Sequence, residues 1–195
     1  AMSEALTIIL KRNDPTAAAK QVSLTELGSI KIEKEDRKKM YKTIPRSSVI
    51  GFLIGVLPGA GATIASFLAY GMERNLVNDD EKQKFGKGSV NGLSAPETAN
   101  NAACSGSFVP MLTLGIPGSG TTAVMLGALL GFGVQPGPRL YMTNPEIFWS
   151  IIMSMYIGMV ILLILNLPLI PYIARILAVP KNYLIPLILF FSITG

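Results

Sequence analysis

Residues 47–72 read SSVIGFLIGVLPGAGATIASFLAYGM and contain no charged side chain. Uncharged apolar stretches of about 18 or more residues are typical of membrane spans, and a straight helix over this one would reach about 39 Å. Pro58 removes a backbone donor and clashes with the preceding turn, while Gly59 and Gly61 permit almost any backbone angle. The stretch therefore predicts a membrane helix that is broken about 16 Å from its start, near the bilayer midplane.

Two further stretches of the chain are nearly free of charge. Residues 88–138 carry only Glu97, and residues 147–174 carry no charge at all. Half of all residues are hydrophobic and 15% are charged, against about 25% charged in an average soluble domain. Trp149 and Tyr172 are separated by about 34 Å of helix, which is close to the distance between the two aromatic belts of a bilayer. The sequence predicts an all-α, polytopic membrane protein with discontinuous helices.

Residues 1–46 differ from the rest because they are polar and mixed in charge. Short helices are expected at residues 3–12 and 33–40, with Pro45 as a helix breaker. The basic run at residues 31–46 lies beside an apolar span, which indicates a cytoplasmic loop under the positive-inside rule. The rival interpretation is nucleic-acid binding, but the run lacks interleaved aromatic side chains and any known motif.

The charge pattern divides the chain into a polar, cytoplasmic N-terminal segment at 1–46 and a transmembrane region at 47–195. Residues 183–195 form an apolar run about half a span long, which indicates that the transmembrane region is a fragment of a larger membrane domain. The loop at 73–88 holds four acidic and four basic side chains, so its charge does not decide its side. Each broken segment can therefore cross the membrane or re-enter.

Residue usage excludes several kinds of chemistry. The chain has no histidine, which excludes His-based triads and His-containing zinc sites, and its single cysteine, Cys104, lies in a small-residue apolar run. We interpret Cys104 as a packing residue. No nucleophile–base pair is visible, so we expect no enzyme activity, no catalytic residue, no metal site and no organic cofactor.

An internal repeat is the most informative feature of the sequence. Residues 57–63 and 116–122 both follow the pattern apolar-Pro-Gly-small-Gly-small-Thr, and each copy interrupts an apolar stretch. Unpaired backbone groups are expensive in lipid, so broken backbone at membrane depth either lines a cavity or is buried in protein. Two interrupted segments in corresponding positions indicate the binding site of a transporter.

The chemistry of this predicted site follows from the breaks. A helix that restarts after Gly61 or Gly120 presents free N–H groups and the positive end of its dipole. Glycine lets a ligand approach the backbone, and neighbouring hydroxyls add donors, so the pocket suits an anion and especially a carboxylate. The predicted substrate-binding residues are Gly59, Gly61, Thr63, Gly118, Ser119, Gly120, Thr121 and Thr122.

A purely structural interpretation of the same glycines and prolines stays open. They can kink helices and let neighbouring helices pack closely, and Gly51-x-x-x-Gly55 and Gly127-x-x-x-Gly131 look like packing faces. A phosphate-binding P-loop is a weaker rival, because neither glycine-rich run is followed by Gly-Lys-Ser/Thr.

A second set of polar residues is Glu97, Asn100 and Asn101, which share one side of a helix by their spacing. Polar side chains in membrane segments are expensive and usually functional. These oxygen ligands are candidates to hold Na⁺ as a coupling ion, or Glu97 to carry H⁺. The alternative is that Glu97 closes a capping box with Ser94 at a helix start, and that the asparagines join helices by hydrogen bonds.

Several longer runs occur between residues 51 and 138. They are GVLPGAG at 55–61, FGKG at 85–88, APETANNA at 95–102, LTLGIPGSGTTA at 112–123 and QPGP at 135–138. With these runs in this order, the stretch resembles the large membrane subunit of the tripartite tricarboxylate transporters.

The resemblance implies a multi-pass secondary transporter of the bacterial inner membrane that imports citrate or related carboxylates by ion-coupled symport. It implies two partners, a small membrane subunit and a periplasmic substrate-binding protein. Large subunits of this family contain two related halves, and this sequence looks like the start of the second half. The alternatives are a pore-forming subunit and an assembly subunit that contacts no substrate.

Overall fold

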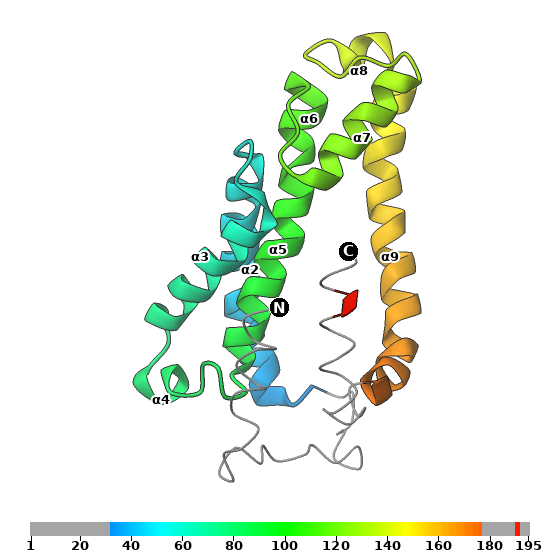
Figure 1. The fold of residues 1–195 in the computed structure, drawn as a ribbon. Coiled ribbons are helices and arrows are strands. Elements are labelled where there is room, and N and C mark those ends of the chain that lie inside the picture. The colour runs from blue at the N-terminus through cyan, green and yellow to red at the C-terminus, as the bar shows by residue number, and fades with distance from the viewer. Residues whose placement is uncertain (1–31, 177–189, 192–195) are drawn as a thin grey trace. The chain divides into compact units, whose positions relative to one another are not determined.

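The structure, a computed structural model, describes residues 32–176 and 190–191, and every element in these ranges is a helix (Figure 1). The helix expected at residues 3–12 lies outside the described residues. Residues 31–155 form one compact unit, which contains both Pro-Gly motifs. The helices are α2 (Lys34–Val56), α3 (Gly61–Leu76), α4 (Asp79–Lys82), α5 (Val90–Gly106), α6 (Phe108–Leu114), α7 (Gly120–Gly131), α8 (Leu140–Thr143) and α9 (Pro145–Ile176).

Helix α2 is longer than predicted. It begins at Lys34, passes through Pro45 without interruption and ends at Val56, so the expectation of a helix broken at Pro45 is wrong. The side chains of Thr43 and Ser47, on either side of the proline, are buried against other helices, whereas Pro45 is exposed. Packing on both sides of the proline holds the helix together despite the lost backbone donor.

The first predicted break is confirmed. Leu57 has an extended backbone, Gly59 and Gly61 have φ values of 80° and 68°, and α3 begins at Gly61. These positive φ values are accessible to glycine at little cost. Helix α3 then runs back along α2, because Arg46 near the start of the apolar stretch bonds Glu73 at its end, at 2.8 Å. The stretch is a helical hairpin and not one interrupted rod.

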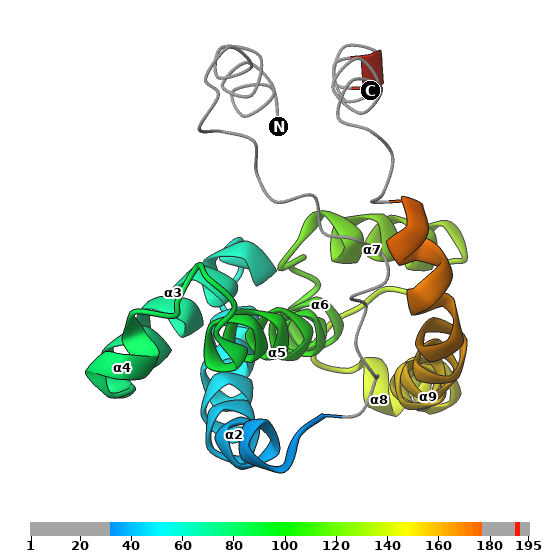
Figure 2. The ribbon, with the colours of Figure 1, turned by 90° about the horizontal axis from the view of Figure 1, so that it is seen from below.

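Helix α5 packs against α2 in parallel through small residues, with a constant offset of 48 positions along the chain. A Cβ atom on Gly51 would lie 2.3 Å from the carbonyl oxygen of Ala99, and one on Gly55 would lie 2.3 Å from that of Ala103. At the start of the contact, Asn91 bonds Thr43. Both views show α5 beside α2 and α3 (Figures 1 and 2). The predicted packing face Gly51-x-x-x-Gly55 is therefore confirmed.

The start of α5 differs from the prediction. Ser89 caps the helix by accepting a hydrogen bond from the N–H of Gly92. Ser94 and Glu97 lie inside the helix, so the predicted capping box between them is wrong. The Oγ atom of Ser94 is buried and has no hydrogen-bond partner within the described residues.

The second predicted break is also confirmed, with a different geometry. Gly115 ends α6 in the left-handed conformation, with a φ value of 68°. The following residues run back along α6, because a Cβ atom on Gly118 would lie 2.9 Å from the Cβ atom of Ser107. Helix α7 starts from there at Gly120. No Cβ contact within 4 Å exists for Gly127 or Gly131, so this predicted packing face has no partner within the described residues.

An apolar core forms around α6, α7 and α8 and the first turns of α9, with Met111, Leu112, Val134 and Leu140 at its centre. Within the described residues, α9 is the one helix that is long and apolar enough to span a bilayer, over Pro145–Ile170. This agrees with the span predicted at 147–174. The number of membrane crossings and the descent of both motifs from one repeated unit stay predictions.

Candidate functional site

The two Pro-Gly motifs meet around one cavity of about 670 Å³. Motifs that are more than fifty residues apart in sequence come together because α5 carries the chain from the base of the hairpin up to the level of its tip. All eight predicted substrate-binding residues line the cavity. The full lining is Gly59, Gly61, Ala62, Thr63, Cys104, Ser107, Phe108, Pro117, Gly118, Ser119, Gly120, Thr121, Thr122 and Ala123.

The N-terminus of α3 opens on this cavity without a cap. Ala60 occupies the N-cap position and offers no side-chain acceptor. The first N–H groups of a helix have no partner inside the helix, and they carry the positive end of its dipole. Gly61, Ala62 and Thr63 all belong to this first turn and to the cavity lining, so backbone donors are available to a bound anion.

The N-terminus of α7 also lies at the cavity, but its own side chains cap it. The N–H of Thr122 donates to the Oγ atom of Ser119 at 3.2 Å, and the N–H of Ser119 donates to the Oγ1 atom of Thr122 at 2.8 Å. Thr122 is only 1% exposed. Its hydroxyl therefore stabilises the helix start, and the two helix ends are not equivalent as anion sites.

The protein groups that face the cavity are uncharged. Among the described residues that line it, none is charged. The hydroxyls of Thr63 and Thr121 are exposed and take part in no hydrogen bond within the described residues. A Cβ atom on Gly118 would lie 3.4 Å from the carbonyl oxygen of Gly55. A larger side chain there would therefore push the two motifs apart.

Six lining residues were not among the predicted ones; Ala62, Pro117 and Ala123 lie in or next to the motifs, and the other three lie elsewhere in the sequence. Cys104, Ser107 and Phe108 come from the end of α5 and the start of α6. The interpretation of Cys104 as a packing residue is wrong, because the side chain is exposed at the cavity. Its place at the cavity follows from the packing of the neighbouring Ala103 against Gly55 on α2, so no local signal in the sequence would have located it.

The three coupling-ion candidates do not converge on one point. Asn100 is half-buried and donates from Nδ2 to the Oγ atom of Ser66 on α3, at 3.3 Å. Asn101 is exposed, and within the described part of the chain its side chain donates only to the carbonyl oxygen of Glu97 one turn earlier. Glu97 is exposed too. None of the three lines the cavity, and their role in ion coupling stays a prediction.

A buried ion pair at the base of the hairpin was not anticipated. Glu73 is fully buried on α3 and accepts hydrogen bonds from three residues. Arg46 donates at 2.8 and 2.9 Å, Thr43 at 2.7 Å and Asn91 at 3.0 Å. The cluster joins α2, α3 and α5 at the base of the hairpin. In the sequence, Arg46 and Glu73 belong to two separate predicted loops, and only the return of α3 brings them together.

A second ion pair joins α2 to the loop after α3. Lys39 donates to Glu81 at 3.0 Å, and Ser89 donates to the other carboxylate oxygen at 2.9 Å. Burial raises the pKa of Glu81, but the hydrogen bonds from Lys39 and Ser89 outweigh it and hold the pKa below its ordinary value. The hydrogen bond to Glu81 in turn raises the pKa of Lys39. Both pairs hold the hairpin base together.

Comparisons with known proteins agree with the sequence motifs. The tripartite tricarboxylate transporter TctA family matches residues 1–195. The chain is similar to an uncharacterized 52.8 kDa protein in the TAR-I ttuC' 3' region of Agrobacterium vitis, with 40% identity over 184 residues, covering 94% of this chain and 36% of that protein. It is also similar to an uncharacterized protein in the TAR-II ttuC' 3' region of the same organism, with 46% identity over 145 residues, covering 74% of this chain and 59% of that protein.

No solved structure matches the chain. The chain spans 36% and 59% of the lengths of the two relatives, so it corresponds to only part of each. The matched family consists of transporter subunits and is not a family of enzymes. The match covers both Pro-Gly motifs, the cavity that they line and the apolar helix α9. The chain belongs to the tripartite tricarboxylate transporter TctA family.

Proposed function

We propose that the chain is part of the membrane subunit of a secondary, ion-coupled transporter that imports tricarboxylates or related carboxylates. The cavity between the two Pro-Gly motifs holds a carboxylate group of the substrate. The observation that carries this proposal is the meeting of two distant, similar motifs around one uncharged cavity. Family membership supports the substrate class.

The uncapped first turn of α3 is the preferred position for the carboxylate. Its free N–H groups and the hydroxyl of Thr63 point to the same cavity, whereas the end of α7 is satisfied by Ser119 and Thr122. Backbone donors at a helix N-terminus bind carboxylates without a cationic side chain. In this arrangement Thr122 holds α7 in place, and Thr63 and Thr121 contact the substrate.

The complete transporter acts in the bacterial inner membrane as a multi-pass protein. It works with a small membrane subunit and with a periplasmic binding protein that delivers the substrate. Na⁺ or H⁺ drives uptake, and Asn100, Asn101 and Glu97 are the candidates to coordinate or carry the ion. The tripartite organisation of the matched family supports the two protein partners.

Substitution of Thr63 tests the site in the full-length protein. We expect Thr63→Val to weaken citrate binding about tenfold or more, because a hydrogen bond to a charged group contributes about 1.5–3 kcal/mol. Thr113→Val is the matched control, since Thr113 is exposed on α6 and, among the residues that the structure describes, its hydroxyl donates only to Val109 of its own helix. Ser119→Ala also weakens binding, but through loss of the α7 cap as well. Wild-type affinity in Thr63→Val would remove this residue from the site.

Cys104 offers a direct probe of the same cavity. In full-length protein that retains no other cysteine, a thiol reagent labels Cys104 because its side chain is exposed at the cavity. We expect citrate to slow this labelling and an uncharged triol to leave it unchanged.

Uphill uptake that depends on an ion gradient separates a transporter from a channel, and radiolabelled citrate binding separates it from an assembly subunit.

A further inference from the structure

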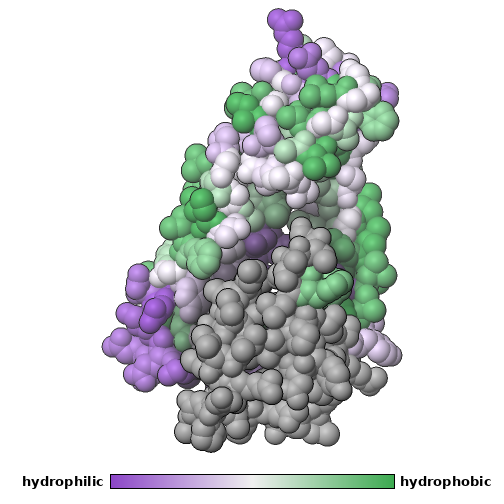
Figure 3. All heavy atoms as spheres, viewed as in Figure 1, coloured by the Kyte–Doolittle hydropathy of each residue, from purple (hydrophilic) through white to green (hydrophobic). Residues whose placement is uncertain are grey.

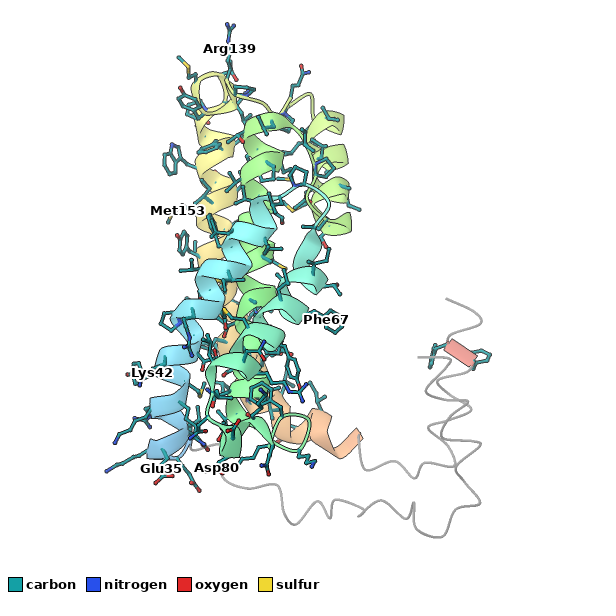
Figure 4. The ribbon with its side chains drawn as sticks, turned by 90° about the vertical axis from the view of Figure 1, so that its left-hand side faces the viewer. Glu35, Lys42, Phe67, Asp80, Arg139 and Met153 are labelled. Atoms are coloured by element: carbon teal, nitrogen blue, oxygen red, sulfur yellow. The ribbon has the colours of Figure 1, made fainter. Side chains whose placement is uncertain are left out.

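The two ends of the uncharged stretch 47–72 lie at the same end of the compact unit. Arg46 precedes the stretch, Glu73 follows it, and their side chains are in contact at 2.8 Å. The Lys39–Glu81 pair, at 3.0 Å, ties the flanking segments together a second time. Figure 4 shows Glu35 and Asp80 at one end of the unit and Arg139 at the opposite end. The hairpin tip at Pro58 is therefore the part of the stretch that lies farthest from this end.

Helices α5 and α6 connect the two ends of the unit. Helix α5 starts beside the hairpin base, where Asn91 bonds Glu73, and reaches the hairpin tip where Ala103 meets Gly55. Helix α6 continues onward until the carbonyl oxygen of Leu112 accepts a hydrogen bond from Gly137. Together they reach about 37 Å, which exceeds the roughly 30 Å of hydrocarbon in a bilayer.

The second Pro-Gly motif approaches the cavity from the opposite end. Gly115 lies beside the carbonyl oxygen of Pro136, 3.0 Å from its ideal Cβ position, at the far end of α6. The chain then descends to Gly118, which faces Ser107 at the cavity, and α7 returns toward Val134, which packs with Leu112. The first motif thus enters the cavity from the base, and the second enters it from the opposite end.

Basic residues are concentrated at only one of these ends. Arg139 is the only lysine or arginine from residue 89 to residue 174. The base end carries the basic run of α2 and the lysines of the loop at 73–88, and hydrophilic residues gather around α4 (Figure 3). The loop at 73–88 is neutral by itself, but the structure joins it to the basic run, and together they carry an excess of lysine and arginine. This is the distribution of a cytoplasmic face.

We infer that residues 47–72 form a re-entrant hairpin that enters and leaves the membrane at the cytoplasmic face. Helices α5 and α6 cross to the periplasmic face, and the second Pro-Gly motif reaches the cavity from there. The cavity is then bounded by one element from each side of the membrane. The inference requires a protein embedded in a bilayer, as the family indicates, but it requires no particular ligand in the cavity.

Cysteine accessibility in the full-length, otherwise cysteine-free transporter tests this topology. The probes are Glu35→Cys, Asp80→Cys and Met142→Cys, all at exposed positions. An impermeant maleimide is applied to intact spheroplasts and again after permeabilisation. We expect Met142→Cys to be labelled in intact spheroplasts, and both Glu35→Cys and Asp80→Cys to be labelled only after permeabilisation.

Two results would overturn the inference. Labelling of Glu35→Cys and Asp80→Cys from opposite faces means that residues 47–72 cross the membrane. Labelling of both from the outside, with Met142→Cys protected, means that the orientation is reversed. Where one of the first variants does not assemble, a nearby exposed position replaces it: Lys38→Cys for Glu35, Lys87→Cys for Asp80 and Tyr141→Cys for Met142. The labelling pattern is independent of substrate, so it stands or fails separately from the effect of Thr63→Val.

Discussion

Glu73 and Arg46 form a pair whose two members differ in their access to water. The Glu73 side chain is fully buried, whereas that of Arg46 is 41% exposed. Removal of one partner of a buried pair costs about 3–5 kcal/mol because the other charge is left without compensation. Here only the carboxylate depends wholly on its partner, since the Arg46 side chain is partly exposed, although its Nε atom is buried. The two residues should therefore respond unequally to substitution.

We predict that Arg46→Gln lowers the free energy of unfolding of the full-length protein by about 3 kcal/mol. Glu73→Gln keeps an acceptor for Thr43 and leaves an arginine that water can solvate, so its loss should be nearer 1 kcal/mol, in the range of a single hydrogen bond. Chemical denaturation in detergent micelles measures both values. Equal losses, or the reverse order, would contradict this view of the pair.

The Lys39–Glu81 pair makes stability depend on pH. The folded pKa of Glu81 lies below its ordinary value of 4.5, so the pair contributes its full stability above that pH and loses it as pH falls through the lower folded pKa. The contribution is modest because the Lys39 side chain is 36% exposed. We expect the unfolding midpoint to fall below pH 4.5 less steeply in Glu81→Gln than in wild type. Parallel curves for the two proteins would exclude this origin.

The contact between α2 and α5 is the element that brings both motifs to the cavity. It depends on the absence of side chains, since the backbones of Gly55 and Ala103 approach too closely for a Cβ atom on the glycine. Close approach of small residues is the usual basis of tight helix packing in membranes. The same close approach determines where along α2 Gly118 contacts Gly55.

We predict that Gly55→Ala destabilises the full-length protein by about 1–3 kcal/mol through overpacking, and that it also weakens citrate binding because the tip of the hairpin moves. Gly71→Ala is the matched control on α3, because nothing lies within 4 Å of its Cβ position. Alanine there should be neutral or stabilising by up to about 1 kcal/mol. Unfolding and binding curves of the two variants give the comparison, and an unaffected Gly55→Ala would show that α2 and α5 separate easily.

Taken as a whole molecule, the described chain exposes large apolar side chains over several helices. Phe67 is 74% exposed on α3, Val124 is 75% exposed on α7, and Phe132 just after α7 is 85% exposed. Soluble monomers rarely present such extended apolar surface. In a bilayer these side chains face lipid or the rest of the transporter.

We therefore expect the isolated 195-residue chain to require detergent. In size-exclusion chromatography it should elute as a defined species in micelles and as aggregate once detergent is removed. A stable monomer in buffer alone would contradict the membrane assignment of the chain, whatever the fate of the individual sites.

The helical class, the two breaks and the family could all be predicted without the structure. Proline and glycine act on the backbone locally, so residues 57–61 and 115–120 could be identified as interruptions without knowledge of their neighbours. The eight predicted substrate-binding residues lie in or next to these interruptions and line the cavity, and their role in binding stays a prediction. The start of α5 was misplaced by a few residues, because Ser89 and Ser94 are equally good caps and only packing selects between them.

The contacts between distant parts of the chain became visible only in the folded protein. No local signal shows that α3 turns back to bring Glu73 to Arg46, that Cys104 faces the cavity, or that Asn100 turns toward Ser66. These contacts depend on the register between α2 and α5, which is set by close packing of glycine against alanine. Such packing is a property of two surfaces in contact and not of either segment alone. The sequence therefore could not show which loops lie together at the same end of the unit.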